Sequence, residues 1–207
     1  MKLLNVLLSV GLLSTSSVLP VSAAIINNGG FENPSIVPPV PGEWMYVTGA
    51  VRDTTNPRSG SFAANLNNVS QAANANVQQQ SATGSVTPGT VYTLSYFAQA
   101  AYGPSGIGQV QIAFLNSGGG ILPGSPQFSN IPSSAAYVGY TQNFTAPANA
   151  SAIFLGFNSV TGAVVNASSH VYVDDVSFAP VPEPTSLALL ALAGAGMLRR
   201  RNAQFRA

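Results

Sequence analysis

The sequence predicts an all-β fold, a two-sheet antiparallel β-sandwich with a helical segment at each end of the chain. Three observations predict it. Short runs typical of strands recur between residues 25 and 180, turns rich in Gly and Pro separate them, and no long stretch there has a helical period. Because no unit repeats at a fixed spacing, a sandwich is favoured over a propeller.

Residues 1–24 have the layout of a secretory signal peptide. Lys2 supplies a positive charge, Leu3 to Leu13 form an apolar stretch, and the small residues Val21 to Ala24 follow at the place of cleavage. A buried N-terminal helix is the alternative. The pattern predicts that residues 1–24 form a signal helix and that the protein is exported.

Residues 25–180 have the size of one β-sandwich domain. This part contains two arginines against five acidic residues, a net charge of −3, so no basic patch is available and nucleic acid is not expected as a partner. The chain has no cysteine, which excludes disulfides, thiol catalysis and cysteine–zinc sites. The single histidine, His170, is interpreted as a loop residue entering the last strand rather than as a catalytic base.

The clearest strand is residues 108–115, in which Val110, Ile112 and Phe114 fall on one face and glutamines on the other. Residues 152–157 are almost continuously apolar, as expected of a strand covered on both faces. The segment Asn65 to Gln80 is the least determined, and its end at residues 75–80 is either a strand or a loop. Two further strands are predicted, at residues 91–98 and 171–178.

Three motifs resemble the exported jelly-roll domains of the carbohydrate-binding, galactose-binding-like type. Asn28-Gly-Gly-Phe-Glu32 matches their opening segment, Pro88 to Ala98 their middle strand, and Val173-Asp-Asp-Val-Ser-Phe178 their last strand. The resemblance spans roughly Ile26 to Phe178. It implies a two-sheet jelly roll in which the first and last strands lie together.

The same resemblance implies a structural Ca²⁺ near that junction. Calcium prefers carboxylate and carbonyl oxygens, which Glu32 with Asp174 or Asp175 would supply. Adjacent strand residues point to opposite faces, so only one of the two aspartates can face such a site without a bulge, and Asp174 is expected to do so. The alternative is that these acids only solvate the end of a strand.

A sugar-binding site would need flat aromatic rings and a few hydrogen-bonding groups. Each aromatic residue considered for sugar stacking has an alternative role in the core, because large aromatic side chains are mostly buried. An enzyme would need paired carboxylates, and nothing in the sequence places Glu43, Asp53 or Asp175 across a cleft. The stacking candidates are Trp44, Tyr46, Tyr96, Tyr102 and Tyr140.

Residues 181–207 resemble a PEP-CTERM sorting signal. The motif is Val181-Pro182-Glu183-Pro184, then the apolar run Leu187 to Leu198, then the cluster Arg199-Arg200-Arg201. A helix of twelve residues rises about 18 Å and spans a bilayer core of about 30 Å only marginally, so the run predicts a short membrane anchor. The resemblance implies processing by an exosortase, transient insertion in the inner membrane and release or attachment at the cell surface.

The sequence therefore favours an exported, non-catalytic protein of the cell surface or extracellular matrix. The alternatives are a calcium-dependent carbohydrate-binding module and, less favoured, a glycan-active enzyme. The low charge and abundant Asn, Gln, Ser and Thr suit an exopolysaccharide surrounding.

Overall fold

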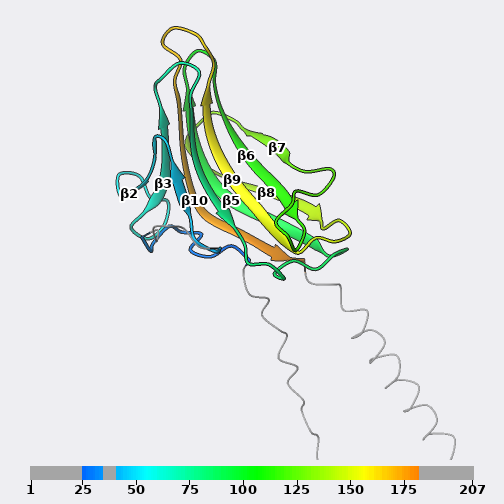
Figure 1. The fold of residues 1–207 in the computed structure, drawn as a ribbon. Coiled ribbons are helices and arrows are strands. Elements are labelled where there is room, and N and C mark those ends of the chain that lie inside the picture. Colours follow the sequence, from blue (N-terminus) through cyan, green and yellow to red (C-terminus); the bar gives the residue numbers. More distant parts are fainter. Residues whose placement is uncertain (1–24, 35–40, 182–207) are drawn as a thin grey trace, which may run out of the picture.

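The computed structural model describes residues 25–34 and 41–181. The described residues form ten strands and no helix, arranged as two five-stranded antiparallel sheets packed face to face (Figure 1). The first sheet has the order β1-β4-β9-β6-β7 and the second β2-β3-β10-β5-β8. The strands are β1 Met45–Val47, β2 Ala50–Asp53, β3 Ala63–Asn68, β4 Asn74–Gln80, β5 Val91–Tyr102, β6 Gly106–Leu115, β7 Gln127–Ile131, β8 Ser134–Thr145, β9 Ala152–Thr161 and β10 Ser169–Pro180. The predicted β-sandwich is confirmed.

The core lies between the sheets and follows the alternation of each strand. In β5 every second residue is buried, and in β6 the predicted face of Val110, Ile112 and Phe114 points inward. Aromatic rings fill the middle, where Tyr96 meets Phe157 edge to face with centroids 5.0 Å apart. Burial of these faces holds the two sheets together.

The predicted strands are present, each extended at one or both ends, and residues 75–80 are a strand, β4. The expectation that residues 152–157 are covered on both faces is confirmed for all but one of them. Ile153, Leu155 and Phe157 lie in the core, while Ala152 and Gly156 are buried on the other face and Phe154 there is half-buried.

The resemblance implied that the first and last strands lie together, but the first strand, β1, pairs with β4 in the other sheet, and it is the non-strand segment of residues 25–34 that lies beside β10. The Ile25 amide donates to the Phe178 carbonyl (3.0 Å), and the Val176 amide donates to the Gly29 carbonyl (3.0 Å). Val181 follows β10 and its amide donates to the Val91 carbonyl (2.8 Å). Both ends of the described domain therefore emerge at the same end of the sandwich (Figure 1).

The expected signal helix at residues 1–24 and the sorting segment from Pro182 onward lie outside the described residues. Among the residues that are described, no helix is long and apolar enough to cross a membrane.

Candidate functional site

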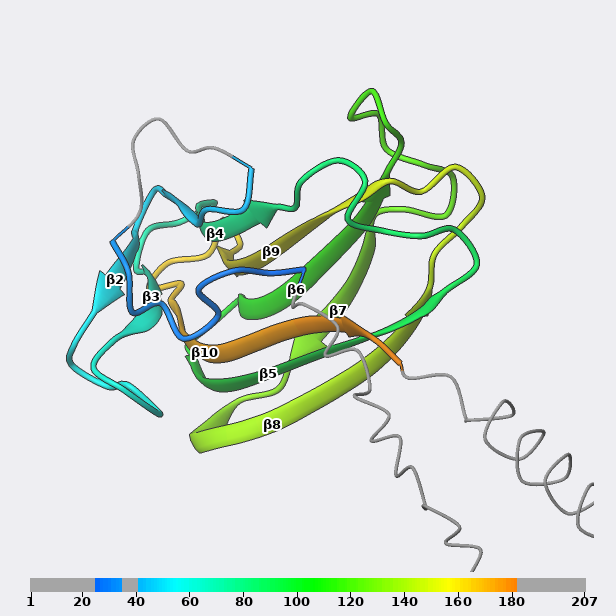
Figure 2. The same ribbon diagram turned by 90° about the horizontal axis from the view of Figure 1, so that it is seen from below.

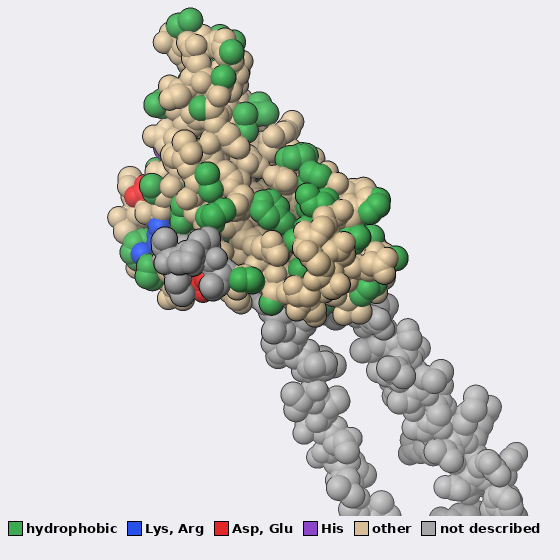
Figure 3. Space-filling model, in the orientation of Figure 1, with side chains coloured by type: hydrophobic (Ala, Val, Ile, Leu, Met, Phe, Trp, Pro, Cys, Tyr) green, Lys and Arg blue, Asp and Glu red, His purple; other side chains and the backbone are tan. Residues whose placement is uncertain are grey.

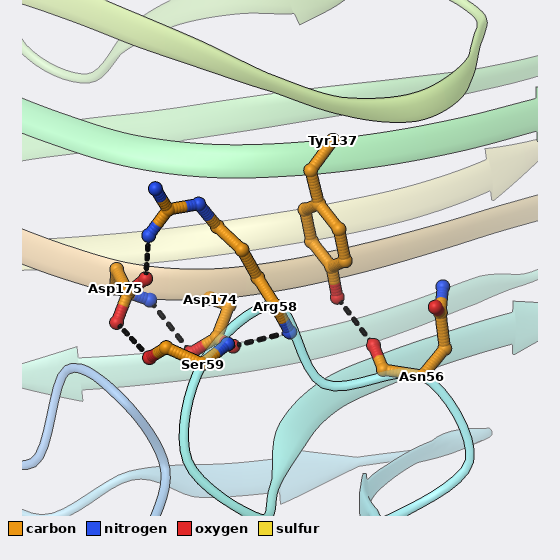
Figure 4. Close-up of polar contacts among 6 residues, drawn as sticks. All are labelled: Asn56, Arg58, Ser59, Tyr137, Asp174 and Asp175. Carbon is orange, nitrogen blue, oxygen red and sulfur yellow. Dashed lines mark hydrogen bonds and ion pairs between the residues drawn. The ribbon is translucent and has the colours of Figure 1, made fainter.

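The two aspartates of the closing motif lie side by side because β10 bulges there. The pairing of β10 with β5 shifts between Asp174 and Ser177, and Asp175 has a positive φ of 50°. Both carboxylates therefore reach the same loop, residues 54–62, between β2 and β3 (Figure 4). The sequence predicted that, without a bulge, only one of the two aspartates could face a common site. The bulge in β10 lets both carboxylates reach the loop of residues 54–62.

This loop satisfies the two carboxylates with its own donors. Asp174, with 0% of its surface exposed, accepts hydrogen bonds from the backbone amides of Arg58 (2.9 Å) and Ser59 (3.1 Å). Asp175 accepts one from the Ser59 hydroxyl (2.7 Å) and forms an ion pair with the Arg58 guanidinium (Figure 4). Burial raises the pKa of Asp174, and these amide hydrogen bonds oppose that rise. We call this group, Arg58, Ser59, Asp174 and Asp175, the loop clasp.

Glu32 lies near the loop clasp, and its carboxylate also accepts hydrogen bonds from the loop between β2 and β3. A Cβ built on Gly30 would lie 3.8 Å from Asp175 Oδ1, 3.9 Å from Asp174 Oδ1 and 3.8 Å from Glu32 Cγ, so Glu32 approaches the two aspartates with its stem, while its carboxylate lies beside Gly60. Glu32 Oε1 accepts the backbone amides of residues 61 (2.9 Å) and 62 (3.1 Å). In the described part of the chain, no three His, Cys, Asp or Glu side chains are grouped so as to hold a metal ion. Amide, hydroxyl and guanidinium donors occupy most of the carboxylate oxygens, so the cluster fits Ca²⁺ poorly.

The aromatic residues considered for stacking belong mainly to the core. Trp44 is 1% exposed, lies 5.0 Å from Phe31 between ring centroids, and donates from Nε1 to the Asn28 carbonyl (2.9 Å). Tyr96 is equally buried. In this structure neither ring presents a face to solvent, so the core alternative holds for both.

Three further tyrosines are half-buried at the edges of the core. Tyr140 stacks on Tyr96 with centroids 5.1 Å apart. The Tyr102 hydroxyl donates to the Ile131 carbonyl (2.6 Å), and burial raises the pKa of Tyr102 to about 12. Burial also raises the pKa of Tyr46 to about 12. None of these rings forms an exposed strip.

The outer face of the β1-β4-β9-β6-β7 sheet carries side-chain amides in a continuous row. Directly paired residues of antiparallel strands share a face, and the neighbours Val77, Phe157 and Val110 point into the core. The intervening residues therefore point outward. They form what we call the amide row, one residue from each of four adjacent strands: Asn76, Asn158, Gln109 and Asn130.

A second row, two residues along each strand, runs beside the amide row. Its centre is Gly156, flanked by two glutamines and ended by two large apolar side chains. We call it the glycine row: Met45, Gln78, Gly156, Gln111 and Phe128. Together the rows cross the whole sheet with amides, an exposed aromatic ring and no ionisable group.

Gly156 lies at the centre of this face, between Asn76 and Phe154. A Cβ at Gly156 would lie 3.3 Å from the Asn76 amide nitrogen and 3.3 Å from a ring carbon of Phe154. Gly156 is itself buried, with the Asn76 amide and the Phe154 ring packed beside its backbone.

The amide row contains an unsatisfied acceptor. Asn76 Nδ2 donates to Asn158 Oδ1 (2.8 Å) and to the Phe157 carbonyl (3.2 Å), whereas Asn76 Oδ1 is buried and has no hydrogen-bond partner. Buried polar atoms are nearly always paired, so this acceptor is an exception in a row whose Asn76 and Asn158 are both 6% exposed.

Asp53 and His170 lie on strands of the other sheet. Asp53 accepts hydrogen bonds from Asn65 Nδ2 (2.6 Å) and from the Thr55 amide and hydroxyl, and these bonds lower its pKa. His170 lies in β10, not in a loop before it, and its Nε2 bonds Asn65 Oδ1 (2.8 Å). In Figure 3 the charged atoms gather at the β2–β3 side, and the rest of that view shows none.

Sequence reasoning missed the amide rows. The outward glutamines of residues 108–115 and the Asn- and Gln-rich segment 65–80 were both visible in the sequence. What was missing was the pairing of β9 with β4 and β6, which aligns residues of these rows that are 45 to 82 positions apart in the chain. A register cannot be read from the strands one at a time.

Comparison with known proteins identifies two parts of the chain. A family model described as a carbohydrate binding domain matches residues 23–162, and a model described as a PEP-CTERM protein-sorting motif matches residues 180–202. Both resemblances seen in the sequence are thereby confirmed. The search of curated proteins found no relative of this chain.

Among solved structures, similar folds occur in carbohydrate-binding modules. One is TmCBM61 in complex with β-1,4-galactotriose, with 12% identity over 77% of this chain and 100% of that one and a TM-score of 0.53. Another is a family 16 carbohydrate-binding module, with 18% identity over 74% and 98% of the two chains and a TM-score of 0.51.

A third is the enzymatically active domain of tailspike protein 4 of bacteriophage CBA120, with 21% identity over 76% of this chain and a TM-score of 0.57. The match spans only 21% of that chain. At these identities the similarities establish the jelly-roll fold.

Proposed function

Because this chain belongs to the carbohydrate binding domain family, whose model matches residues 23–162, we propose that it is an exported, non-catalytic protein that binds neutral glycans. The proposed binding surface is the outer face of the β1-β4-β9-β6-β7 sheet, formed by the amide row, the glycine row and the Phe154 ring. The observation that carries the proposal is the buried, unpartnered Asn76 Oδ1 beside Gly156.

The chemistry of this face suits a sugar. A side-chain amide offers two donors and one acceptor in a plane, which matches vicinal hydroxyl groups. Gln78 and Gln111 form no side-chain hydrogen bond within the described residues, so both are available to a ligand. Phe154 and the 53% exposed Phe128 supply apolar surface for the C–H face of a pyranose ring.

The same face supports the absence of catalysis. Glycoside hydrolysis needs an acid and a second carboxylate flanking the bond, and neither row contains a carboxylate. The acids Asp53, Asp174 and Asp175 belong to the other sheet, where their oxygens are held by donors of the domain.

The PEP-CTERM motif assigns the protein to the cell surface or the extracellular space. In the proposed scheme, an exosortase recognises Pro182-Glu183-Pro184 after export, while Leu187 to Leu198 and the three arginines hold the chain briefly in the inner membrane. An exopolysaccharide outside the cell is then the expected ligand. Both ends of the domain emerge together, so an anchored protein would still present its amide rows.

The test is glycan-array screening of the full chain, followed by calorimetry with the best glycan. Gln111→Ala and Phe154→Ala should each weaken binding by about tenfold, the loss expected when one hydrogen-bonded or stacked sugar contact is removed. Asn67→Ala is the matched control, because it removes an exposed amide from the other sheet. Binding that survives both changes, or no binding by folded protein to any neutral glycan, would refute the proposal.

The calcium ion expected from the resemblance stays a prediction. In the loop clasp, Arg58 and backbone amides bind the carboxylates of Asp174 and Asp175, which supports a junction held together without a calcium ion. Measuring glycan affinity in the presence of a chelator distinguishes a calcium site from a metal-free loop clasp, and we expect the affinity to be unchanged.

A further inference from the structure

The four edge strands of the sandwich differ in how they are protected. β1 has three residues and β2 four, including Arg52 and Asp53, while the five-residue β7 is closely flanked by Pro126 and Pro132. Short length, charge and proline are the usual means of preventing an edge from pairing with another chain. These three edges are therefore blunted.

β8 lacks all three protections. It has twelve residues, Ser134–Thr145, with no charged side chain and no proline, and it pairs only with β5. Figure 2 shows it along the outer margin of its sheet. Half of its backbone amide and carbonyl groups face away from β5, as in any edge strand.

The core is also left partly open along β8. Val138, Tyr140 and Phe144 pair with Ala98, Tyr96 and Tyr92, whose side chains point into the core, so they face inward as well. Yet Tyr140 and Phe144 are only half-buried, and Val138 is 41% exposed. A strand added beside β8 would cover these flanks.

We propose that β8 pairs with β8 of a second copy of this chain, in antiparallel orientation about a two-fold axis, so that two five-stranded sheets join into one of ten strands. A strand paired antiparallel with its own copy matches each donor to an acceptor by symmetry. The strand itself has no charged side chain, so two copies of β8 would bring no like charges of their own against each other.

The geometry of such a pair places Thr141 near its symmetry mate. Directly opposite residues share a face, so outward residues meet outward residues. Thr141 points outward, like its partner Ser95 in β5, and lies next to the middle of β8. In a pairing that overlaps most of the strand, Thr141 is therefore opposite or diagonal to Thr141 of the second copy.

The test is the mass of the full chain in non-ionic detergent, measured by light scattering and sedimentation equilibrium over a range of concentrations. The unmodified chain should dimerise. Thr141→Lys and Thr141→Asp should each weaken the dimer by at least about tenfold, because like charges face each other across the interface. An equimolar mixture of the two variants should restore it, because unlike charges then meet.

Val91→Lys is the matched control, since it adds the same charge to the same face on β5, a strand paired on both sides. It should leave the dimer unchanged, and circular dichroism should show the same thermal unfolding for all variants. A monomeric unmodified chain, a Thr141→Lys variant that associates like the unmodified chain, or a mixture that stays monomeric would each overturn the proposal.

Discussion

Tyr46 and Tyr102, both considered for sugar stacking, differ in the surroundings of one oxygen atom. The Tyr46 hydroxyl is buried without a hydrogen-bond partner, whereas the Tyr102 hydroxyl donates to the Ile131 carbonyl. An unpaired buried polar group costs free energy, and a paired one contributes. The two residues should therefore respond in opposite ways to loss of the hydroxyl.

We predict that Tyr46→Phe leaves the free energy of unfolding unchanged or raises it by about 1 kcal/mol, because it removes an unsatisfied hydroxyl. Tyr102→Phe should lower it by about 1–3 kcal/mol, because the Ile131 carbonyl loses its donor. Urea denaturation at neutral pH, where both tyrosines are protonated, measures the difference. Equal losses in the two variants would contradict this account.

At the same scale, the fate of each aromatic side chain was only partly predictable. Trp44 and the tyrosines were open to core or surface roles, because composition does not say which face of a strand a residue occupies. Trp44 is a core residue because the rings of Phe31 and Phe157, which are 13 and 113 residues away in the chain, pack against it. Such contacts exist only once the sheets are packed.

Among the elements, the strands with strong alternation or β-branched residues were predicted, and the polar ones were not. β5, β6, β9 and β10 have clear apolar faces. β8 was missed because its inward residues Val138, Tyr140 and Phe144 are interspersed with small and polar ones, so its apolar alternation is incomplete.

The loop between β2 and β3 leads to a second prediction about an element. Arg58 lies 3.3 Å above the Phe97 ring centroid and pairs with Asp175, so Arg58→Gln should lower the free energy of unfolding by about 1–2 kcal/mol, with partial exposure limiting the ionic share. If the loop clasp replaces a metal, EGTA should leave the melting temperature of the unmodified chain unchanged. A drop with EGTA that added Ca²⁺ reverses would favour the calcium site instead.

At the scale of the whole molecule, the two arginines of the domain lie away from the proposed ligand-binding face. Both arginines of the domain are engaged at one end, Arg58 over Phe97 and Arg52 3.0 Å above the Phe62 ring centroid. The amide and glycine rows contain no ionisable side chain. This distribution was partly visible in the sequence as a low charge, but its segregation depends on where β2 and β10 lie in the fold.

A ligand held by these rows should be bound through hydrogen bonds and stacking, not through net charge. We predict that raising NaCl from about 0.05 M to about 0.5 M changes the affinity for the best neutral glycan by less than about twofold, since screening acts on charges. An acidic polysaccharide of the same backbone, with uronic acids in place of hexoses, should bind at least about tenfold more weakly, because each carboxylate must be desolvated against a face without cations. Calorimetry with the two polymers at both salt concentrations measures this. Preferential binding of the acidic polymer that salt abolishes would show that the ligand sits instead near Arg52 and Arg58, at the opposite sheet.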